Sequence, residues 1–254
     1  MKVTFLGTGT SQGIPVIACD CEVCISENKH DKRLRVSVLI EHQGKSIVVD
    51  AGPDFRYQML RAGVRHLDAL LFTHEHKDHV AGLDDVRAFN YKQQSEINVY
   101  ADLRVQQALK REFHYIFSEA KYPGIPRLEL HEIRADQPFT VAGIEIIPIS
   151  VMHYKLPVFG YRIGDFTYIT DAKTIDNENI EKIRGSKILV INALQKESHV
   201  SHLTFDEAID LAQEIGAAET YLTHISHRLG THANISVELP NGIALAYDGL
   251  ELHS

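Results

Sequence analysis

The chain has 254 residues, of which 44% are hydrophobic and 24% are charged, and its formal net charge at pH 7 is −8. This composition excludes an intrinsically disordered chain, and the negative charge argues against a broad binding surface for nucleic acid or anionic membranes. A chain of this length can bury one substantial core, so we expect a single domain over residues 1–254.

The N-terminus and the cysteines predict a cytoplasmic protein. No apolar run approaches the roughly 18 residues that a membrane span needs. The segment Met1–Leu6 reaches Gly7 too early for the apolar region of a signal peptide. All three cysteines fall within Cys19–Cys24, and such an odd, crowded set suits metal ligation better than a disulfide framework.

Short apolar, β-branched runs recur along the chain, each bounded by Gly, Pro, Asp or polar residues, which is the pattern of strands. The runs are Val3–Leu6, Val36–Ile40, Ile47–Val49, Ala69–Phe72, Ile97–Tyr100, Ile144–Val151 and Ile188–Ile191. The second and third runs flank Gly44 as in a hairpin, and later runs alternate with helical patterns.

Two segments predict helices. Leu103–Phe117 carries apolar residues spaced for one helical face. In Thr204–Ile215, Thr204 and Glu207 have the spacing of a capping box, and an apolar pattern follows them. Hairpin-like strands combined with alternating strands and helices indicate an α/β protein in layers, not a purely parallel wound sheet.

A histidine-rich motif follows the run Ala69–Phe72. It contains His74, His76, Asp78 and His79. Imidazole nitrogen and carboxylate oxygen are ligands for zinc, manganese or iron. A strand-to-helix junction supplies the turn at which these side chains converge, with Asp78 and His79 opening the helix. The alternative, a solvated polar turn, is a weaker explanation for four ligand-type residues within six positions.

The motif His74-x-His76-x-Asp78-His79 resembles the signature of the metallo-β-lactamase superfamily. Its other motifs appear in order at predicted strand ends, at Asp50, His153, Asp171 and His224. The resemblance implies a four-layer αββα sandwich of two mixed sheets. It also implies one divalent ion on His74, His76, His153 and Asp171, and a second ion on Asp78, His79, His224 and a bridging Asp171. Asp50 is then expected to orient the histidines.

The cysteine motif supplies three thiolates, Cys19, Cys21 and Cys24, one short of a tetrahedral zinc site. Together with Gly7, Gly9, Gly13 and Pro15 it looks like the start of PhnP-type phosphoribosyl cyclic phosphate phosphodiesterases. That resemblance implies a structural Zn²⁺ whose fourth ligand is His227, three residues after His224. The zinc would clip the loop at residues 16–28. A redox-active thiol group is the alternative.

The resemblance implies a metal-dependent phosphodiesterase of a small cyclic phosphate or other diester. Two ions, Mn²⁺ or Zn²⁺, activate water and stabilise the leaving oxygen in such sites. Asp78 belongs to this catalytic set. His202 lies 22 residues before His224, where relatives place a general acid. A capping or surface role is the alternative for His202.

Substrate contacts and partners are less specified by the sequence. Arg56, Arg87 and Asn90 follow the motifs and are candidates to hold the substrate phosphate, although each arginine could instead form a solvated ion pair. The alternative functions are a ribonuclease Z-like nuclease and a non-catalytic carrier resembling the pyrroloquinoline quinone pathway protein. The net charge disfavours nucleic acid beyond nucleotides or short oligonucleotides. Family resemblance implies a homodimer.

Overall fold

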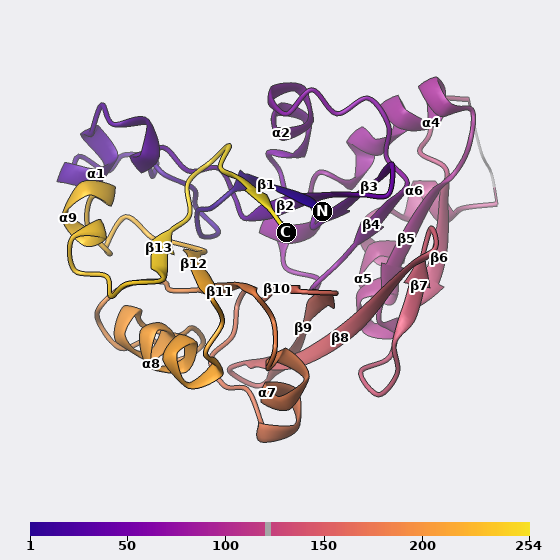
Figure 1. The fold of residues 1–254 in the computed structure, drawn as a ribbon. Helices are drawn as coiled ribbons and strands as arrows, with labels where there is room; N and C mark the ends of the chain where they lie inside the picture. The colour runs from indigo at the N-terminus through magenta and orange to yellow at the C-terminus, as the bar shows by residue number, and fades with distance from the viewer. Residues whose placement is uncertain (120–122) are drawn as a thin grey trace.

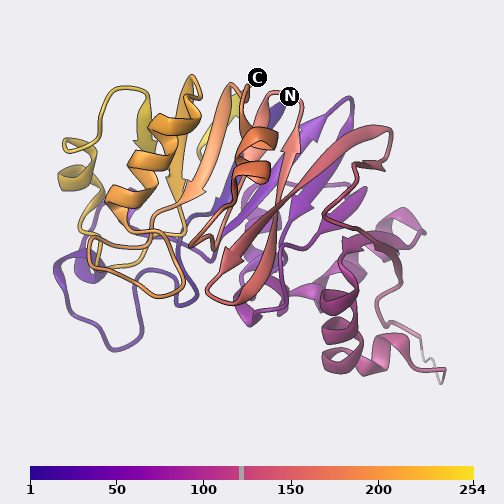
Figure 2. The ribbon, with the colours of Figure 1, turned by 90° about the horizontal axis from the view of Figure 1, so that it is seen from below.

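The computed structural model describes residues 1–119 and 123–254. In this part of the chain, two seven-stranded sheets pack face to face and helices cover their outer faces (Figures 1 and 2). Each sheet combines antiparallel strands with parallel strands. The predicted α/β fold, a four-layer αββα sandwich of two mixed sheets, is confirmed.

The first sheet comes from the N-terminal half of the chain and the last strand. Its order is β14-β1-β2-β3-β4-β5-β6. The strands are β1 (Lys2–Gly7), β2 (Ser37–His42), β3 (Lys45–Val49), β4 (Ala69–Leu71), β5 (Ile97–Ala101), β6 (Leu128–Glu132) and β14 (Glu251–His253). Its helical segments are α1 (Glu22–Ile25), η1 (Lys29–Asp31), α2 (Phe55–Arg61), α3 (Lys77–Val80), η2 (Leu83–Val86), α4 (Arg87–Gln93), α5 (Leu103–Glu112) and α6 (His114–Phe117).

The second sheet has the order β13-β12-β11-β10-β9-β8-β7. Its strands are β7 (Phe139–Val141), β8 (Ile144–His153), β9 (Leu156–Ile163), β10 (Phe166–Tyr168), β11 (Ile188–Asn192), β12 (Glu219–Thr223) and β13 (Ile243–Leu245). The helices in this half are α7 (Asn177–Ile183), α8 (Phe205–Ile215) and α9 (His232–Ser236), and α9 lies beside α1 (Figure 1).

The layers follow from the alternation of side chains along each strand. In β2, Val38 and Ile40 enter the core between the two sheets, whereas Leu39 enters the core beneath the helices of the first sheet. Because both faces of the sheet are covered, successive residues of a strand are apolar. A third core lies under α7 and α8, where Ile180 and Phe205 are buried.

Both predicted helical segments contain helices, but one of them is divided into two. The capping box is confirmed, because Thr204 accepts from the backbone N–H of Glu207 and the Glu207 carboxylate accepts from that of Thr204. The segment Leu103–Phe117 is not one helix. Phe113 leaves helical dihedral angles between α5 and α6, and both Phe113 and Phe117 pack against the core of the first sheet. None of the described helices has the length and apolar character needed to cross a membrane.

Candidate metal centres

The chain turns sharply where several strands end at one edge of the sandwich. Asp50 follows β3, Asp171 lies three positions after the end of β10, and His224 follows β12. All three have positive φ angles, of 64°, 57° and 55° respectively. Residues other than glycine rarely adopt a positive φ, and residues with such strained backbone angles are common at functional sites.

Two glycines let the loops after β3 and β4 touch. A Cβ atom on Gly52 would lie 1.9 Å from the carbonyl oxygen of Asp78, and one on Gly82 would lie 2.1 Å from that of Gly52. The backbone N–H of Ala51 donates to the His79 carbonyl at 2.8 Å. This close approach fixes the turn that carries Asp78 and His79 against the loop that carries Asp50.

Asp50 contacts His79, one of the histidines that the resemblance expects it to orient. Its Oδ2 atom lies 2.7 Å from Nδ1 of His79 and accepts from the Thr73 hydroxyl at 2.8 Å, and its Oδ1 atom accepts from the backbone N–H of Thr73 at 2.8 Å. Burial raises the pKa of Asp50, against the opposing effect of His79. These bonds occupy Nδ1 of His79 and leave its Nε2 atom for another partner.

Other histidines are held through one ring nitrogen in the same way. Nδ1 of His74 lies 3.0 Å from the hydroxyl of Thr73. Nδ1 of His153 lies 2.9 Å from the carbonyl oxygen of Ser201 and 3.1 Å from that of Asp171. The ring of His76 lies 4.6 Å from that of His74 and 5.3 Å from that of His153, centroid to centroid. These three rings therefore share one side of the site.

Two carboxylates face the remaining nitrogens. Nε2 of His79 lies 3.3 Å from both Asp78 and Asp171, and Nε2 of His224 lies 3.2 Å from Asp171 and 3.9 Å from Asp78. Burial alone would raise the pKa of Asp171, but His224 and His79 hold it well below its ordinary value. Burial would lower the pKa of His79, yet Asp78 and Asp50 raise it well above its ordinary value. The buried carboxylates of Asp78 and Asp171 therefore favour positively charged groups beside them.

The donor set fits divalent metal ions. Nε2 of His74, His79 and His224 are buried, and no described group makes a hydrogen bond to them. An orphaned buried imidazole nitrogen costs free energy unless a ligand satisfies it. Ligand atoms of His74, His79 and Asp171 lie within 4.8 Å of one another, as do those of Asp78, His79 and His224. We name the seven residues the histidine cluster: His74, His76, Asp78, His79, His153, Asp171 and His224.

His202 also reaches this cluster. It is 8% exposed, and its ring centroid lies 4.6 Å from that of His153 and 4.8 Å from that of His224. Its Nδ1 atom lies 3.7 Å from Oδ1 of Asp171. Burial, and then the neighbouring His224, lower the pKa of His202 to about 3. The imidazole is thus aimed at the same space as the carboxylates.

The three cysteines and His227 form a second group, which we name the cysteine cluster. Nδ1 of His227 lies 3.3, 3.4 and 3.6 Å from the sulfur atoms of Cys19, Cys21 and Cys24. Zinc bonds of about 2.3 Å to sulfur and about 2.0 Å to nitrogen place tetrahedral donors roughly 3.5 Å apart. Despite burial, hydrogen bonds from the Cys24 backbone and from His227 lower the pKa of Cys21 to about 6. The group therefore matches a closed zinc site.

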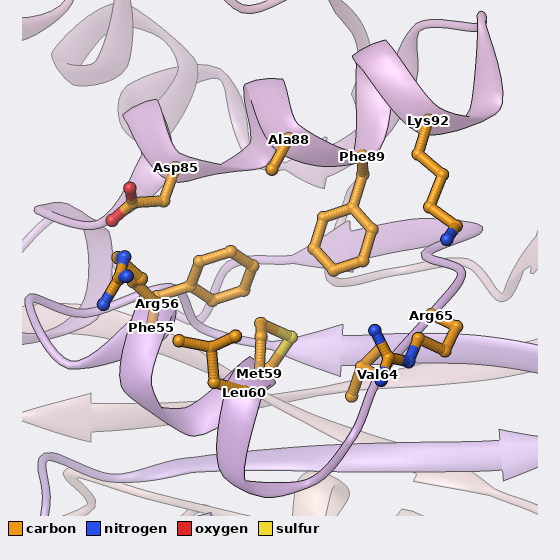
Figure 3. A pocket seen from close by; sticks show the side chains of 10 residues that line it. All are labelled: Phe55, Arg56, Met59, Leu60, Val64, Arg65, Asp85, Ala88, Phe89 and Lys92. Atoms are coloured by element: carbon orange, nitrogen blue, oxygen red, sulfur yellow. The ribbon is translucent and has the colours of Figure 1, made fainter.

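The structure places the candidate phosphate-binding residues Arg56, Arg87 and Asn90 in two pockets beside α4. Arg56 lines a pocket between α2 and α4, on the side of Asp85 (Figure 3). Arg87 pairs with Asp84 at 3.2 Å, and the buried Asn90 amide bonds backbone groups of Ser95 and Arg127. Neither the pocket beside Arg56 nor the one beside Arg87 and Asn90 includes a residue of the histidine cluster in its lining.

Thr73 is the functional residue that the sequence reading missed. Its hydroxyl lies within hydrogen-bonding distance of both Asp50 and His74, so it links the two loops behind the ligands. Arg104 has a similar supporting role, because it binds Glu75 and donates to the Pro157 carbonyl at 2.6 Å. The position of Thr73, directly before the histidine motif, is the signal that could have identified it.

Known proteins share the family and the fold of this chain. A family model described as Beta-lactamase superfamily domain matches residues 45–225. A crystal structure described as a new diphosphatase from the PhnP family superposes with a TM-score of 0.93 at 39% identity, covering 100% of this chain and 97% of that one. Zn²⁺-bound PqqB from Methylobacterium extorquens has the same fold, with a TM-score of 0.80 at 19% identity over 100% of both chains.

Two curated relatives extend the comparison. An octanoyltransferase from Porphyromonas gingivalis is 45% identical over 99% of this chain, but this chain spans only 51% of that protein. A ribonuclease Z from Bradyrhizobium diazoefficiens is 28% identical over 89% of this chain and 90% of its own length. With the family match, the fold and the ligand motifs in agreement, the chain belongs to the metallo-β-lactamase superfamily of metal-dependent hydrolases.

Proposed function

We propose that this protein is a metal-dependent phosphodiesterase that hydrolyses a small cyclic phosphate or other phosphodiester. The observation that carries the proposal is the convergence of buried imidazole nitrogens, which lack other partners in the described part of the chain, on Asp78 and Asp171. The similarity to a PhnP-family diphosphatase supports phosphate chemistry.

We assign the ligands of two Mn²⁺ or Zn²⁺ ions within the histidine cluster. One ion would be held by His74, His76, His153 and Asp171, and the other by Asp78, His79, His224 and Asp171. When bound, such ions lower the pKa of water and polarise a phosphoryl oxygen. Asp78 and Asp171 supply the negative charge that retains them, and Asp50 and Thr73 keep the ring nitrogens aimed inward.

His202 is proposed to give a proton to the leaving oxygen. Its ring lies between His153 and His224 and touches no carboxylate at hydrogen-bonding distance. An anionic substrate opposes the lowering of the His202 pKa, because negative charge stabilises the imidazolium form. The proton then moves from the imidazole to the alkoxide as the ester bond breaks.

The cysteine cluster is proposed to hold one structural Zn²⁺. Its four donors complete a tetrahedral set and leave no open position for substrate. The ion would join the loop at residues 16–28 to the loop after β12, which also carries His224. We further propose that residues 1–254 act as one domain, that the protein works in the cytoplasm, and that it forms a homodimer.

Other activities receive less support. The ribonuclease Z from Bradyrhizobium diazoefficiens is 28% identical over most of this chain, but the net charge of −8 disfavours a large RNA substrate. A carrier would not need the complete set of seven ligands. This chain spans 51% of the octanoyltransferase relative, so the activity in the name of that protein is not carried over to this chain.

The test is hydrolysis with defined metals. Protein stripped by chelation is refilled with Mn²⁺ or Zn²⁺ and assayed on bis-p-nitrophenyl phosphate, a 2′,3′-cyclic nucleotide, phosphoribosyl 1,2-cyclic phosphate and a β-lactam. We expect metal-dependent turnover of a diester and none of the β-lactam. Bound metal without turnover of any diester would instead favour the carrier.

A further inference from the structure

The turn between β8 and β9 places an exposed aromatic side chain directly after a residue of the histidine cluster. His153 pairs with Leu156, so the turn consists of Tyr154 and Lys155 alone. Tyr154 is 56% exposed and has a φ of 56°. For a bulky side chain this left-handed conformation is an outlier.

The other two-residue hairpins show what such a turn ordinarily requires. Each contains glycine: Gln43-Gly44 between β2 and β3, Ala142-Gly143 between β7 and β8, and Gly164-Asp165 between β9 and β10. Gly164 occupies the same first position as Tyr154 and has the same φ of 56°. Glycine suits this position without strain. Gln43 and Ala142 also hold a positive φ at the first position, of 51° and 49°, but a glycine follows each of them. Among these four turns, Tyr154-Lys155 is the one without a glycine.

The Tyr154 side chain lines a pocket beside the histidine cluster. Tyr154 and Lys155 line a pocket of about 460 Å³ together with the ligand residues His76 and His153. The remaining lining includes Leu156 and Val200, and Val200 is 65% exposed. No carboxylate lines this pocket. Its surface thus combines apolar groups, positive charge and access to the proposed metal centre.

Lys155 completes the surface. Its Nζ atom lies 5.3 Å from the centroid of the Tyr154 ring, as in a cation–π contact. In the part of the chain that the structure describes, Lys155 forms no ion pair, so its charge remains available to an anion. An aromatic face beside a free ammonium is the chemistry that binds a planar ring attached to a phosphate.

We propose that Tyr154 is a specificity-determining residue that stacks on the base of a nucleotide-type phosphodiester, with Lys155 facing its phosphate and Val200 on the same pocket wall. This inference rests on the proposed phosphodiesterase function and narrows its substrate to the nucleotide class. The strained turn persists because the ring contacts substrate.

The experiment compares Tyr154→Gly with Tyr154→Phe and with Ala142→Gly. Ala142 is the matched control, because it has a φ of 49° in another two-residue hairpin away from the pocket. Metal-loaded proteins are titrated calorimetrically with AMP and with ribose 5-phosphate, which lacks the base. Turnover of 2′,3′-cyclic AMP and of phosphoribosyl 1,2-cyclic phosphate is measured beside it.

We expect Tyr154→Gly to weaken AMP binding about tenfold, from the usual strength of base–aromatic stacking, and to leave ribose 5-phosphate binding unchanged. Tyr154→Phe keeps AMP binding, and Ala142→Gly changes neither ligand. The Tm of Tyr154→Gly does not fall, since glycine relieves the strained φ.

Two results would overturn the inference: equal binding of AMP and ribose 5-phosphate by the unaltered protein, or equal weakening of both ligands in Tyr154→Gly. A lower Tm in that variant would show a structural role for the ring and would also count against it. If the proposed function is wrong, the protein hydrolyses no diester, whether AMP or ribose 5-phosphate binds more tightly. That result differs from the two above.

Discussion

The cysteine cluster and the histidine cluster share one loop but are assembled in opposite ways. His224 and His227 are three residues apart after β12. The cysteine cluster takes its other members from one short segment, Cys19–Cys24. The histidine cluster gathers side chains from the ends of β4, β8, β10 and β12, across both sheets.

The difference in assembly accompanies a difference in chemistry. Three thiolates and one imidazole make a closed zinc site, which stabilises a loop and offers no position to substrate. Imidazoles and two carboxylates distributed over strand ends surround an open space bordered by a pocket. Backbone hydrogen bonds hold the loop that carries His224 and His227. The N–H of Ile225 donates to the Thr8 carbonyl at 2.9 Å, and that of Ser226 donates to the Leu194 carbonyl at 3.0 Å. These two bonds hold the segment between His224 and His227, and so they position a member of each cluster.

Removing the carboxylate common to both proposed ions should have the largest effect. We expect Asp171→Ala to lower diester turnover by more than about 100-fold, beyond the 10- to 100-fold typical of residues that only orient ligands. Elemental analysis should show that the zinc of the cysteine cluster remains. Asp210→Ala, an exposed carboxylate on α8, is the control and should behave like the unaltered protein.

His202→Ala separates proton transfer from metal binding. We expect kcat to fall about 10²- to 10⁴-fold, the usual contribution of a general acid, while metal content stays the same. His199→Ala, whose ring lies 5.0 Å from that of His202 on the same loop, should have a much smaller effect. Unchanged turnover in His202→Ala would remove this residue from the mechanism.

Asp50→Asn tests the support behind the histidine cluster. The substitution removes the charged acceptor for Nδ1 of His79, so we expect metal affinity to weaken about 10- to 100-fold. Affinity is measured by competition with a chelator. If the affinity matches that of the unaltered protein, the contact between Asp50 and His79 does not orient the ligand.

His227→Ala should affect stability more than catalysis. Loss of one zinc donor releases the loop at residues 16–28, and we expect Tm to fall by about 4–10 °C. Turnover should fall by less than about tenfold, since the histidine cluster keeps all its members. His253→Ala, at the exposed end of β14, is the control. A cysteine cluster without zinc in the unaltered protein would contradict this prediction.

Arg87→Ala should have the smallest effect. Because Arg87 pairs with Asp84 at an exposed position and lies outside the pocket beside His153, we expect kcat and KM within about twofold of the unaltered protein. Asn90→Ala should leave kinetics similar but cost about 1–3 kcal/mol of stability, since its amide satisfies buried backbone groups. A raised KM in either variant would contradict this prediction and would indicate that the residue binds the substrate phosphate.

The sequence predicted which side chains lie together where residue type and position were both restrictive. His74, His76, Asp78 and His79 occur together at a strand-to-helix junction, and few structures other than a metal site use that combination. The layered fold and the capping box at Thr204 were predicted for the same reason, because periodicity and capping chemistry agreed locally.

The remainder depends on tertiary contacts. Nothing in the spacing of Asn90 indicates that its amide bonds Arg127, 37 residues away. The break at Phe113 depends on packing against the first sheet, which local helix propensity does not register. No sequence pattern indicates a role for Tyr154, because its positive φ is a property of the folded backbone.

The account depends on two different metal centres in one chain, and anomalous diffraction from crystals grown with Zn²⁺ and Mn²⁺ tests this most directly. We predict three peaks: two about 3.5–4 Å apart within the histidine cluster, and one, at the zinc edge only, among Cys19, Cys21, Cys24 and His227. A single peak in the histidine cluster, or none at the cysteines, would contradict it.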